Sequence, residues 1–150
     1  MAPIFITYGI LLPFLFSRWH PEHMLSLHRD PVAHQLLRLG VMPSAADRLS
    51  KGGTLLDLPA GTALCTEGER GTQAFFILEG TAHVLLTDGV VEIGPGEVTG
   101  ELAALDPHRT RNASVIAHTD LLVLVYDVPT FRSLADDEDL RDVLVPTRAA

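Results

Sequence analysis

Hydrophobic and polar positions alternate along this chain with two different periods. Between residues 54 and 126, short runs rich in Val, Ile, Leu and Phe are separated by turns that contain glycine. Runs of this length, bounded by turn residues at nearly even spacing, are typical of β-strands. Before residue 50 and after residue 129, apolar residues recur three and four positions apart, which indicates helices that bury one face.

The middle of the chain predicts six to eight short strands. Those that the pattern defines best cover residues 54–58, 63–65, 74–78, 83–86, 90–93, 113–117 and 121–126. Asp88-Gly89, between two of these runs, is the strongest hairpin signal in the chain. Short strands at this spacing predict a closed or sandwiched all-β unit.

Helices are expected on both sides of this β unit. Asp30 followed by Pro31 predicts an N-cap with proline in the first turn, and the helix should end at Gly40. A second short helix is expected from Ser44 to Leu49, capped by Ser44 and ended by Gly52 and Gly53. After the last strand, the apolar spacing predicts a helix from Pro129 to Leu144, although an acidic run interrupts its pattern.

These patterns divide the chain into four parts. Residues 1–17 form an apolar N-terminal segment, and residues 18–53 form a helical lead-in. Residues 54–127 form the β unit, and residues 128–150 form a C-terminal helix and an acidic tail. A chain of 150 residues is long enough for one domain with a hydrophobic core.

The N-terminal segment leaves three interpretations open. Residues 1–16 carry no charged side chain, but sixteen helical residues rise only ~24 Å. A bilayer core is ~30 Å thick, and Pro3 and Pro13 weaken a helix further. The segment could pack on the protein or a partner, contact a membrane or be the stub of a lost transmembrane region, or reflect a misassigned start with Met24 as the first residue. We expect a cytoplasmic protein, with membrane association through residues 1–16 as an open alternative.

Charge and cysteine content exclude several classes of function. The formal net charge of −8 disfavours direct binding to nucleic acid, although one local site can still hold a small anion. Cys65 is the single cysteine, so the chain cannot build a disulfide framework or a cysteine metal cluster. Four histidines between residues 20 and 34 are interleaved with prolines and share no helix face, so we expect no metal site there.

One segment interrupts the strand pattern. Residues 100–105, Gly-Glu-Leu-Ala-Ala-Leu, favour a helical turn between two strands. The free N–H groups at the start of such a turn, together with its dipole, favour an anion. Arg111, expected at the start of the next strand, can fold back toward this turn, and its guanidinium matches phosphate geometry. With Glu101 as a carboxylate, the segment predicts a site for a phosphate joined to a hydroxyl-bearing sugar.

The β region also contains short motifs in a fixed order. They are Leu58-Pro59-Ala60-Gly61-Thr62, Glu67-Gly68, Gly71, Phe75-Phe76-Ile77-Leu78-Glu79-Gly80, Gly94-Pro95-Gly96-Glu97, Gly100-Glu101-Leu102-Ala103 and Arg111-Asn112-Ala113. In this order they resemble the cyclic-nucleotide-binding domain of bacterial catabolite-activator-type regulators, kinase regulatory subunits and gated channels. The resemblance covers residues 54–126. It implies a mainly β fold, an antiparallel β-roll (a double-stranded β-helix or jelly-roll), with N-terminal helices and a short C-terminal helix.

The resemblance also implies roles for individual residues. The turn from Gly100 to Ala103 resembles the family's phosphate-binding cassette, and Glu101 would accept a hydrogen bond from the ribose 2′-hydroxyl. The amides of Leu102 and Ala103 would hold the cyclic phosphate, which Arg111 would neutralise. The implied ligand is cyclic AMP or cyclic GMP, with no further cofactor and no catalytic residue.

Two further residues complete the implied site, and two features depart from the family pattern. Asn112 and Ala113 would line the phosphate and the base edge, but the family usually has Thr, Ser or Ala where Asn112 stands. This departure leaves the choice between cyclic AMP and cyclic GMP open. Thr99 occupies a position that is often apolar or aromatic, and the C-terminal helix is short for a lid over the ligand.

We therefore expect a regulatory or sensor protein that binds a cyclic nucleotide and is not an enzyme. The few residues after the last strand are acidic, so they do not predict a DNA-binding domain. The helices at Asp30–Leu39 and Pro129–Leu144 are expected to transmit ligand occupancy to a protein partner or a fused output domain. A homodimer is an open alternative.

Two other functions fit parts of the pattern. A β-roll that has lost its ligand would serve as an interaction or membrane-tethering module, which Asn112 and the short C-terminal helix favour. A metal enzyme of the cupin type needs two close histidines and a carboxylate on adjacent strands. The expected strands contain only His83, and His118 falls at a strand end. The cyclic nucleotide hypothesis therefore leads.

Overall fold

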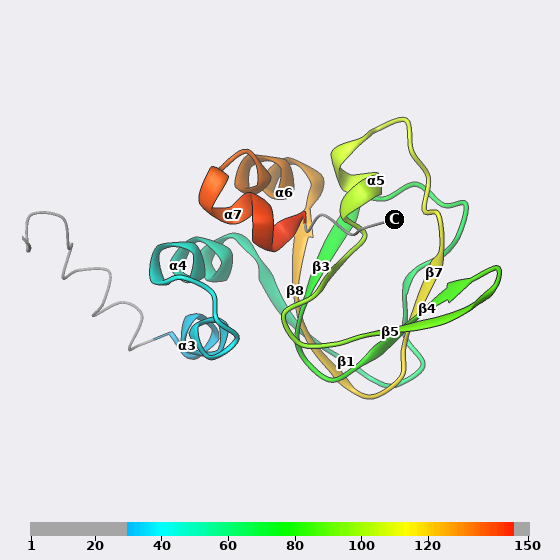
Figure 1. The fold of residues 1–150 in the computed structure, drawn as a ribbon, viewed down its shortest axis with the longest axis horizontal. Coiled ribbons are helices and arrows are strands. Elements are labelled where there is room, and N and C mark those ends of the chain that lie inside the picture. Colours follow the sequence, from blue (N-terminus) through cyan, green and yellow to red (C-terminus); the bar gives the residue numbers. More distant parts are fainter. Residues whose placement is uncertain (1–29, 146–150) are drawn as a thin grey trace, which may run out of the picture.

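The computed structural model describes residues 30–145, whose strands form two four-stranded antiparallel sheets (Figure 1). One sheet, in the order β1-β8-β3-β6, contains β1 (Thr54–Leu58), β8 (Leu121–Asp127), β3 (Gln73–Glu79) and β6 (Val98–Thr99). The other, in the order β2-β7-β4-β5, contains β2 (Ala63–Cys65), β7 (Ser114–Ala117), β4 (Ala82–Leu86) and β5 (Gly89–Ile93). This arrangement confirms the antiparallel β-roll with flanking helices.

Strands β3 and β8 are neighbours in the first sheet, and both of its faces are covered there. Phe75 and Ile77 belong to a core between the two sheets, whereas Phe76 and Leu78 belong to a second core on the opposite face. Successive side chains of a strand point to opposite faces. A strand covered on both faces therefore needs an unbroken apolar run, as in residues 74–78.

Four helices cover the outer face of the first sheet. They are α3 (Pro31–Arg38), α4 (Pro43–Gly52), α6 (Val128–Ala135) and α7 (Glu138–Leu144). Their buried side chains, among them Leu36, Leu49, Phe131 and Leu140, pack against the outward-facing residues of β3 and β8. Figure 1 shows these helices on one side of the strands, with α5 (Glu101–Leu105) near the top of the view. The helices before and after the β-roll therefore share one core.

The first helix is confirmed. Asp30 is the N-cap of α3, and its Oδ1 accepts hydrogen bonds from the amides of Val32 and Ala33 at 2.9 and 3.3 Å. The helix ends before Gly40, whose φ of +88° lies in the left-handed region. Glycine adopts this conformation without steric strain, which explains the stop.

The prediction for the second helix was wrong at its start. α4 begins at Pro43 rather than Ser44, and its N-cap is Met42, whose side chain makes no capping bond. The proline ring already fixes φ near the helical value, so Pro43 takes the first position and Ser44 falls inside the turn. The helix continues past Leu49 to Gly52, and Gly53 is its C-cap, so the two glycines end it as expected.

The C-terminal helix, expected as one element from Pro129 to Leu144, is in fact two helices. α6 ends at Ala135 and α7 begins at Glu138. Between them Asp137 caps α7, because its Oδ1 accepts a hydrogen bond from the amide of Asp139 at 2.9 Å. Aspartate favours such caps over helix interiors, so the acidic run is where the helix breaks.

Two strand features also differ from the prediction. Gly89 pairs with Leu86 as the first residue of β5, so the turn residues of the hairpin are Thr87 and Asp88 rather than Asp88-Gly89. The two-residue strand β6 was not predicted, because a strand of that length has no periodicity to detect. Both differences are local, and the strand order is unaffected.

No helix within residues 30–145 is long and apolar enough to span a membrane. The expectations for residues 1–16 and for Met24, together with those for the histidines before residue 30, lie outside the described residues.

Candidate functional site

Helix α5 follows β6 through Gly100, which is the N-cap of α5. Gly100 has a φ of +83°, a conformation that L-residues rarely adopt. A Cβ atom at this position would lie 2.5 Å from Nη1 of Arg111. Glycine is therefore required here both by the backbone conformation and by the close approach of an arginine.

Arg111 is not at the start of a strand, as the sequence had suggested, but precedes β7 by three residues. Its backbone is held by the loop that follows β2. The amide of Arg111 donates to the carbonyl of Glu69 at 2.7 Å, and its carbonyl accepts from the amide of Gly68 at 2.8 Å. Arg70 and Thr110 pair beside these contacts as an isolated β-bridge. These contacts fix the position from which the side chain extends.

The guanidinium of Arg111 is buried and oriented by two backbone carbonyls. Nη1 donates to the Gly100 oxygen at 2.8 Å, and Nη2 donates to the Gln73 oxygen at 2.6 Å. Only 8% of the residue is exposed. Carbonyl oxygens carry no net charge, so these two bonds orient the cation without neutralising it. They also use two of the five N–H groups of the guanidinium.

A second glycine leaves room for this arrangement. A Cβ atom on Gly71 would lie 2.5 Å from Cβ of Ala103 and 3.0 Å from Cζ of Arg111. The φ of Gly71 is not in the left-handed region, so only this close packing requires glycine. The loop after β2 therefore packs directly against α5 and Arg111.

These elements enclose a pocket of about 200 Å³, which we call the α5 pocket. It is lined by Cys65, Val84, Thr99, Gly100, Glu101, Leu102, Ala103, Arg111, Asn112 and Ala113. All seven residues of the expected site are among these ten. The sequence thus identified a set of residues that the fold brings together, although they come from two separate segments.

Sequence reasoning did not place Cys65, Val84 and Thr99 in the site. Cys65 and Val84 lie on different strands and both pair with Val115, one on each side of β7. Only the strand register shows that they face the same pocket. Thr99 directly precedes Gly100, and this adjacency was the one available signal.

Cys65 lies close to the charged residues of the pocket. Burial raises the pKa of its thiol, while the nearby Arg111 lowers that pKa and Glu101 raises it. Burial has the largest effect, and a side-chain hydrogen bond with Thr99 acts in the opposite direction. The thiol is therefore neutral near pH 7 and behaves as a small buried side chain rather than as a nucleophile.

Within residues 30–145, no group of three or more His, Cys, Asp and Glu side chains is placed to hold a metal ion. His83 and His118 stack with ring centroids 4.0 Å apart, and Nε2 of His83 lies 3.7 Å from Oε2 of Glu92. These three groups lie outside the α5 pocket. The described residues thus give the metal-enzyme hypothesis no support.

Comparison with known proteins points to the same region. The sequence model of a family described as the cyclic nucleotide-binding domain matches residues 55–138, which include the whole α5 pocket. The match begins at β1 and extends past α6.

Two curated relatives are effector proteins. The Pycsar effector protein PaPycTIR of Pseudomonas aeruginosa is 36% identical over 123 residues, which cover 81% of this chain and 40% of the relative. The Pycsar effector protein XpPycTIR of Xanthomonas perforans is 35% identical over 92 residues, which cover 61% of this chain and 30% of the relative. The chain thus spans less than half the length of these relatives.

A solved structure shares the fold. It is described as Sp-2Cl-cAMPS bound to PKAR CBD2 and is 23% identical, with a TM-score of 0.61. The superposition covers 71% of this chain and 74% of the other.

Proposed function

Because this chain belongs to the cyclic nucleotide-binding domain family, we propose that it is a sensor whose ligand is a 3′,5′-cyclic nucleotide. The observation that carries the proposal is the buried guanidinium of Arg111, which faces the α5 pocket from one side while α5 begins on the other. A buried cation that is oriented by neutral carbonyls favours an anion of matching shape.

Each group of the pocket has a role in this proposal. Arg111 neutralises the cyclic phosphate, and the amides of Leu102 and Ala103, at the start of α5, donate to its oxygens. The half-buried carboxylate of Glu101 accepts a hydrogen bond from the ribose 2′-hydroxyl. A carboxylate beside a phosphate is unfavourable unless a donor group separates them, which the hydroxyl does.

The base of the ligand is adenine in cyclic AMP or guanine in cyclic GMP. We propose that Asn112 contributes to the preference for one of these bases. Asn112 and Ala113 follow Arg111 directly and line the α5 pocket. Asn112 is exposed, so its amide can turn toward the ligand, and an amide offers both a donor and an acceptor. Cys65, Val84 and Thr99 complete the wall with small side chains.

We propose further that residues 54–127 form the ligand-binding unit and that the helices on either side of it report occupancy. The helices α3, α4, α6 and α7 share one core, so a shift in one pair of helices affects the other. The activity that the ligand controls would then belong to a protein partner or to a fused domain. The match to only part of longer relatives supports this proposal. In this proposal the chain binds and signals but does not catalyse.

A second candidate function is a ligand-independent interaction module. One observation favours it: the two protein carbonyls that hold Arg111 already fix the guanidinium in place. These two bonds lie within the protein and involve no nucleotide, so a chain that has lost nucleotide binding would keep them.

Isothermal titration calorimetry with cyclic AMP and with cyclic GMP tests the proposal. We expect saturable binding of at least one, and we expect Arg111→Ala to weaken it by at least about 30-fold, or about 2 kcal/mol. Arg109→Ala is the matched control, because Arg109 lies in the same loop with 59% of its side chain exposed. Equal binding by wild type and Arg111→Ala would remove the role of Arg111. Absence of binding to the wild type, with no thermal stabilisation at millimolar nucleotide, would favour the interaction module.

A further inference from the structure

Two arginines hold the two ends of helix α5. At its start, Nη1 of Arg111 donates to the carbonyl of Gly100 at 2.8 Å. At its end, Nε of Arg132 donates to the carbonyl of Ala104 at 3.0 Å. Arg132 belongs to α6, so this second bond joins the pocket helix to the C-terminal helices.

The two bonds act on a single helical turn. The amide of Ala104 donates to the carbonyl of Gly100 at 3.2 Å, so Gly100 accepts from both Arg111 and Ala104. A helix of five residues is not stable alone, and its position is set by what it contacts. Ala104 is fully buried, so its carbonyl needs a donor within the protein, and Nε of Arg132 is such a donor. A movement of α5 would therefore change this contact with α6.

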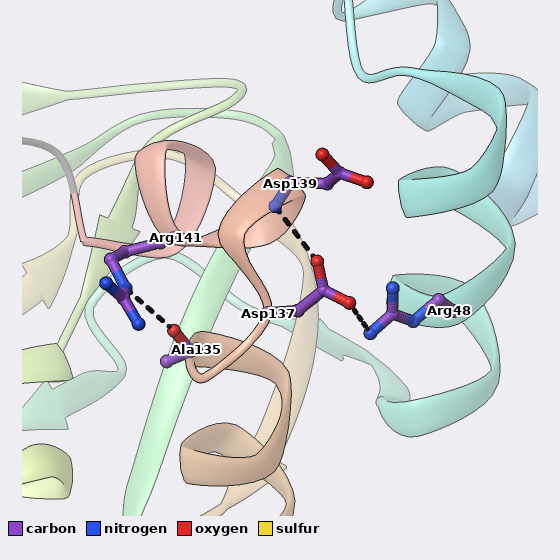
Figure 2. Close-up of polar contacts among 5 residues, drawn as sticks. All are labelled: Arg48, Ala135, Asp137, Asp139 and Arg141. Atoms are coloured by element: carbon purple, nitrogen blue, oxygen red, sulfur yellow. Dashed lines mark hydrogen bonds and ion pairs between the residues drawn. The ribbon is translucent and has the colours of Figure 1, made fainter.

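The same type of contact continues into the next helix. Nε of Arg141, in α7, donates to the carbonyl of Ala135 at the end of α6, at 3.3 Å. Asp137, the N-cap of α7, forms an ion pair with Arg48 of α4. Figure 2 shows Arg141 reaching back to Ala135 and Asp137 lying between Asp139 and Arg48. The polar contacts thus run from α5 through α6 and α7 to α4.

From this arrangement we propose that Arg132 is a positioning residue that transmits occupancy of the α5 pocket to helices α6 and α7. The proposal rests on the proposed function. A bound phosphate competes with the Gly100 carbonyl for Nη1 of Arg111, and α5 shifts as that bond weakens. Arg132 follows the carbonyl of Ala104 and moves α6, and the contacts at Ala135 and Asp137 extend the shift to α7 and α4.

A purely structural role for Arg132 makes a different prediction. If Arg132 only satisfied a buried carbonyl, its loss would destabilise α5 and weaken nucleotide binding. If it transmits the shift, the ligand spends part of its binding free energy on moving α6 and α7. Breaking the link then leaves the affinity equal or higher while the helices stop responding.

Hydrogen–deuterium exchange tests this proposal. It is measured with and without whichever nucleotide, cyclic AMP or cyclic GMP, binds more tightly. In the wild type we expect the nucleotide to slow exchange at residues 100–111 and to change exchange at residues 128–144. Arg132→Met keeps an unbranched side chain that reaches as far as the position of Nε but removes the donor. In this variant we expect the response at 128–144 to fall by at least about half while that at 100–111 persists. Arg132→Lys, which keeps a charged donor, should restore part of the response.

Arg109→Met is the matched control, because Arg109 is exposed and pairs with Asp106. It is not one of the residues whose contacts link α5 to α6, α7 and α4. A wild-type response at 128–144 in Arg132→Met would overturn the proposal, as would a loss of affinity in parallel with loss of stability. In the ligand-free protein, Arg132→Met should also speed exchange at 101–105, and unchanged exchange there would show that the bond does not hold α5. A wild type that binds neither nucleotide would instead refute the proposed function itself.

Discussion

The carbonyl oxygen of Gly100 lies 2.8 Å from Nη1 of Arg111, although the two residues are 11 positions apart in the chain. The same nitrogen would lie 2.5 Å from a Cβ atom on Gly100. Arg111 lies close enough to Gly100 for the carbonyl to orient the guanidinium. The same short distance leaves no room for a side chain at residue 100. The shape of the α5 pocket depends on this pair.

Gly100→Ala should impair both stability and binding. The positive φ alone costs an alanine about 1 kcal/mol, and the contact with Nη1 must also be relieved by moving Arg111. We expect nucleotide affinity to fall at least about tenfold, which corresponds to about 1.4 kcal/mol. Urea unfolding and titration calorimetry measure the two effects.

Gly40→Ala separates the two causes. Gly40 has a similar φ of +88°, but nothing lies within 4 Å of a Cβ atom there. We expect a similar backbone cost of about 1 kcal/mol and unchanged affinity. Normal affinity in both variants would mean that the contact between residues 100 and 111 does not shape the pocket.

Gly71→Ala should weaken nucleotide binding for a steric reason. Its new Cβ atom would meet Cβ of Ala103 at 2.5 Å and push α5 away from the loop after β2. Combining it with Ala103→Gly removes that clash, so the double variant should bind more tightly than Gly71→Ala alone. Titration calorimetry of both variants measures this, and equal affinities would show that the clash is relieved elsewhere.

Tyr126→Phe should destabilise the fold without altering the pocket. The hydroxyl of Tyr126 donates to the carbonyl of Leu49 at 2.6 Å, and both residues are almost completely buried. Burial also raises the pKa of Tyr126 well above its usual range, so the hydroxyl stays a neutral donor. Removing it leaves a buried acceptor without this donor, which costs about 1–3 kcal/mol. A change of less than about 0.5 kcal/mol in urea unfolding would show that another donor replaces it.

Asp137→Asn should destabilise the protein at neutral pH and not in acid. Arg48 beside Asp137, with the amide of Asp139, holds the pKa of this carboxyl below its usual 3.8. A lowered folded-state pKa gives stability that is present above the unfolded-state value and lost as the pH falls through the folded-state value. The difference in unfolding free energy between wild type and variant should therefore be largest at pH 7. It should shrink as the pH falls below 3.8 and vanish below the folded-state pKa. Chemical unfolding at pH 7 and in acid measures this difference.

Asp127→Asn is the control for that experiment. Asp127 is also an N-cap with a lowered pKa, but the cause is its hydrogen bonding with Thr130 rather than an arginine. At about 1 M salt, where the screening length falls to about 3 Å, the effect of Asp137→Asn should shrink and that of Asp127→Asn should persist. Equal salt dependence would contradict the role of the Arg48 pair.

The sequence predicted the strands well because most of their pattern is created by burial. Residues 74–78 and 121–126 are apolar throughout because helices cover one face of the sheet and the second sheet covers the other. The same pattern gave no sign of β6, which is too short to have a period. It also merged α6 and α7, although the acidic residues 136–139 interrupt the apolar spacing at the point where Asp137 caps α7.

The site was partly predictable for a related reason. The seven expected residues lie in two continuous segments, so motif order alone collected them, and the fold places all seven around one pocket. Cys65 and Val84 could not be found this way, since their shared partner Val115 is defined only by strand register. The contact of Arg132 with Ala104 depends on how α6 packs against α5, which no local pattern encodes.

A crystal structure of the chain with the tighter-binding cyclic nucleotide tests the central claim most directly. The account predicts the cyclic phosphate within hydrogen-bonding distance of the Arg111 guanidinium, with the ribose 2′-hydroxyl beside Glu101. A nucleotide bound outside the α5 pocket, or one whose phosphate does not touch Arg111, would contradict it.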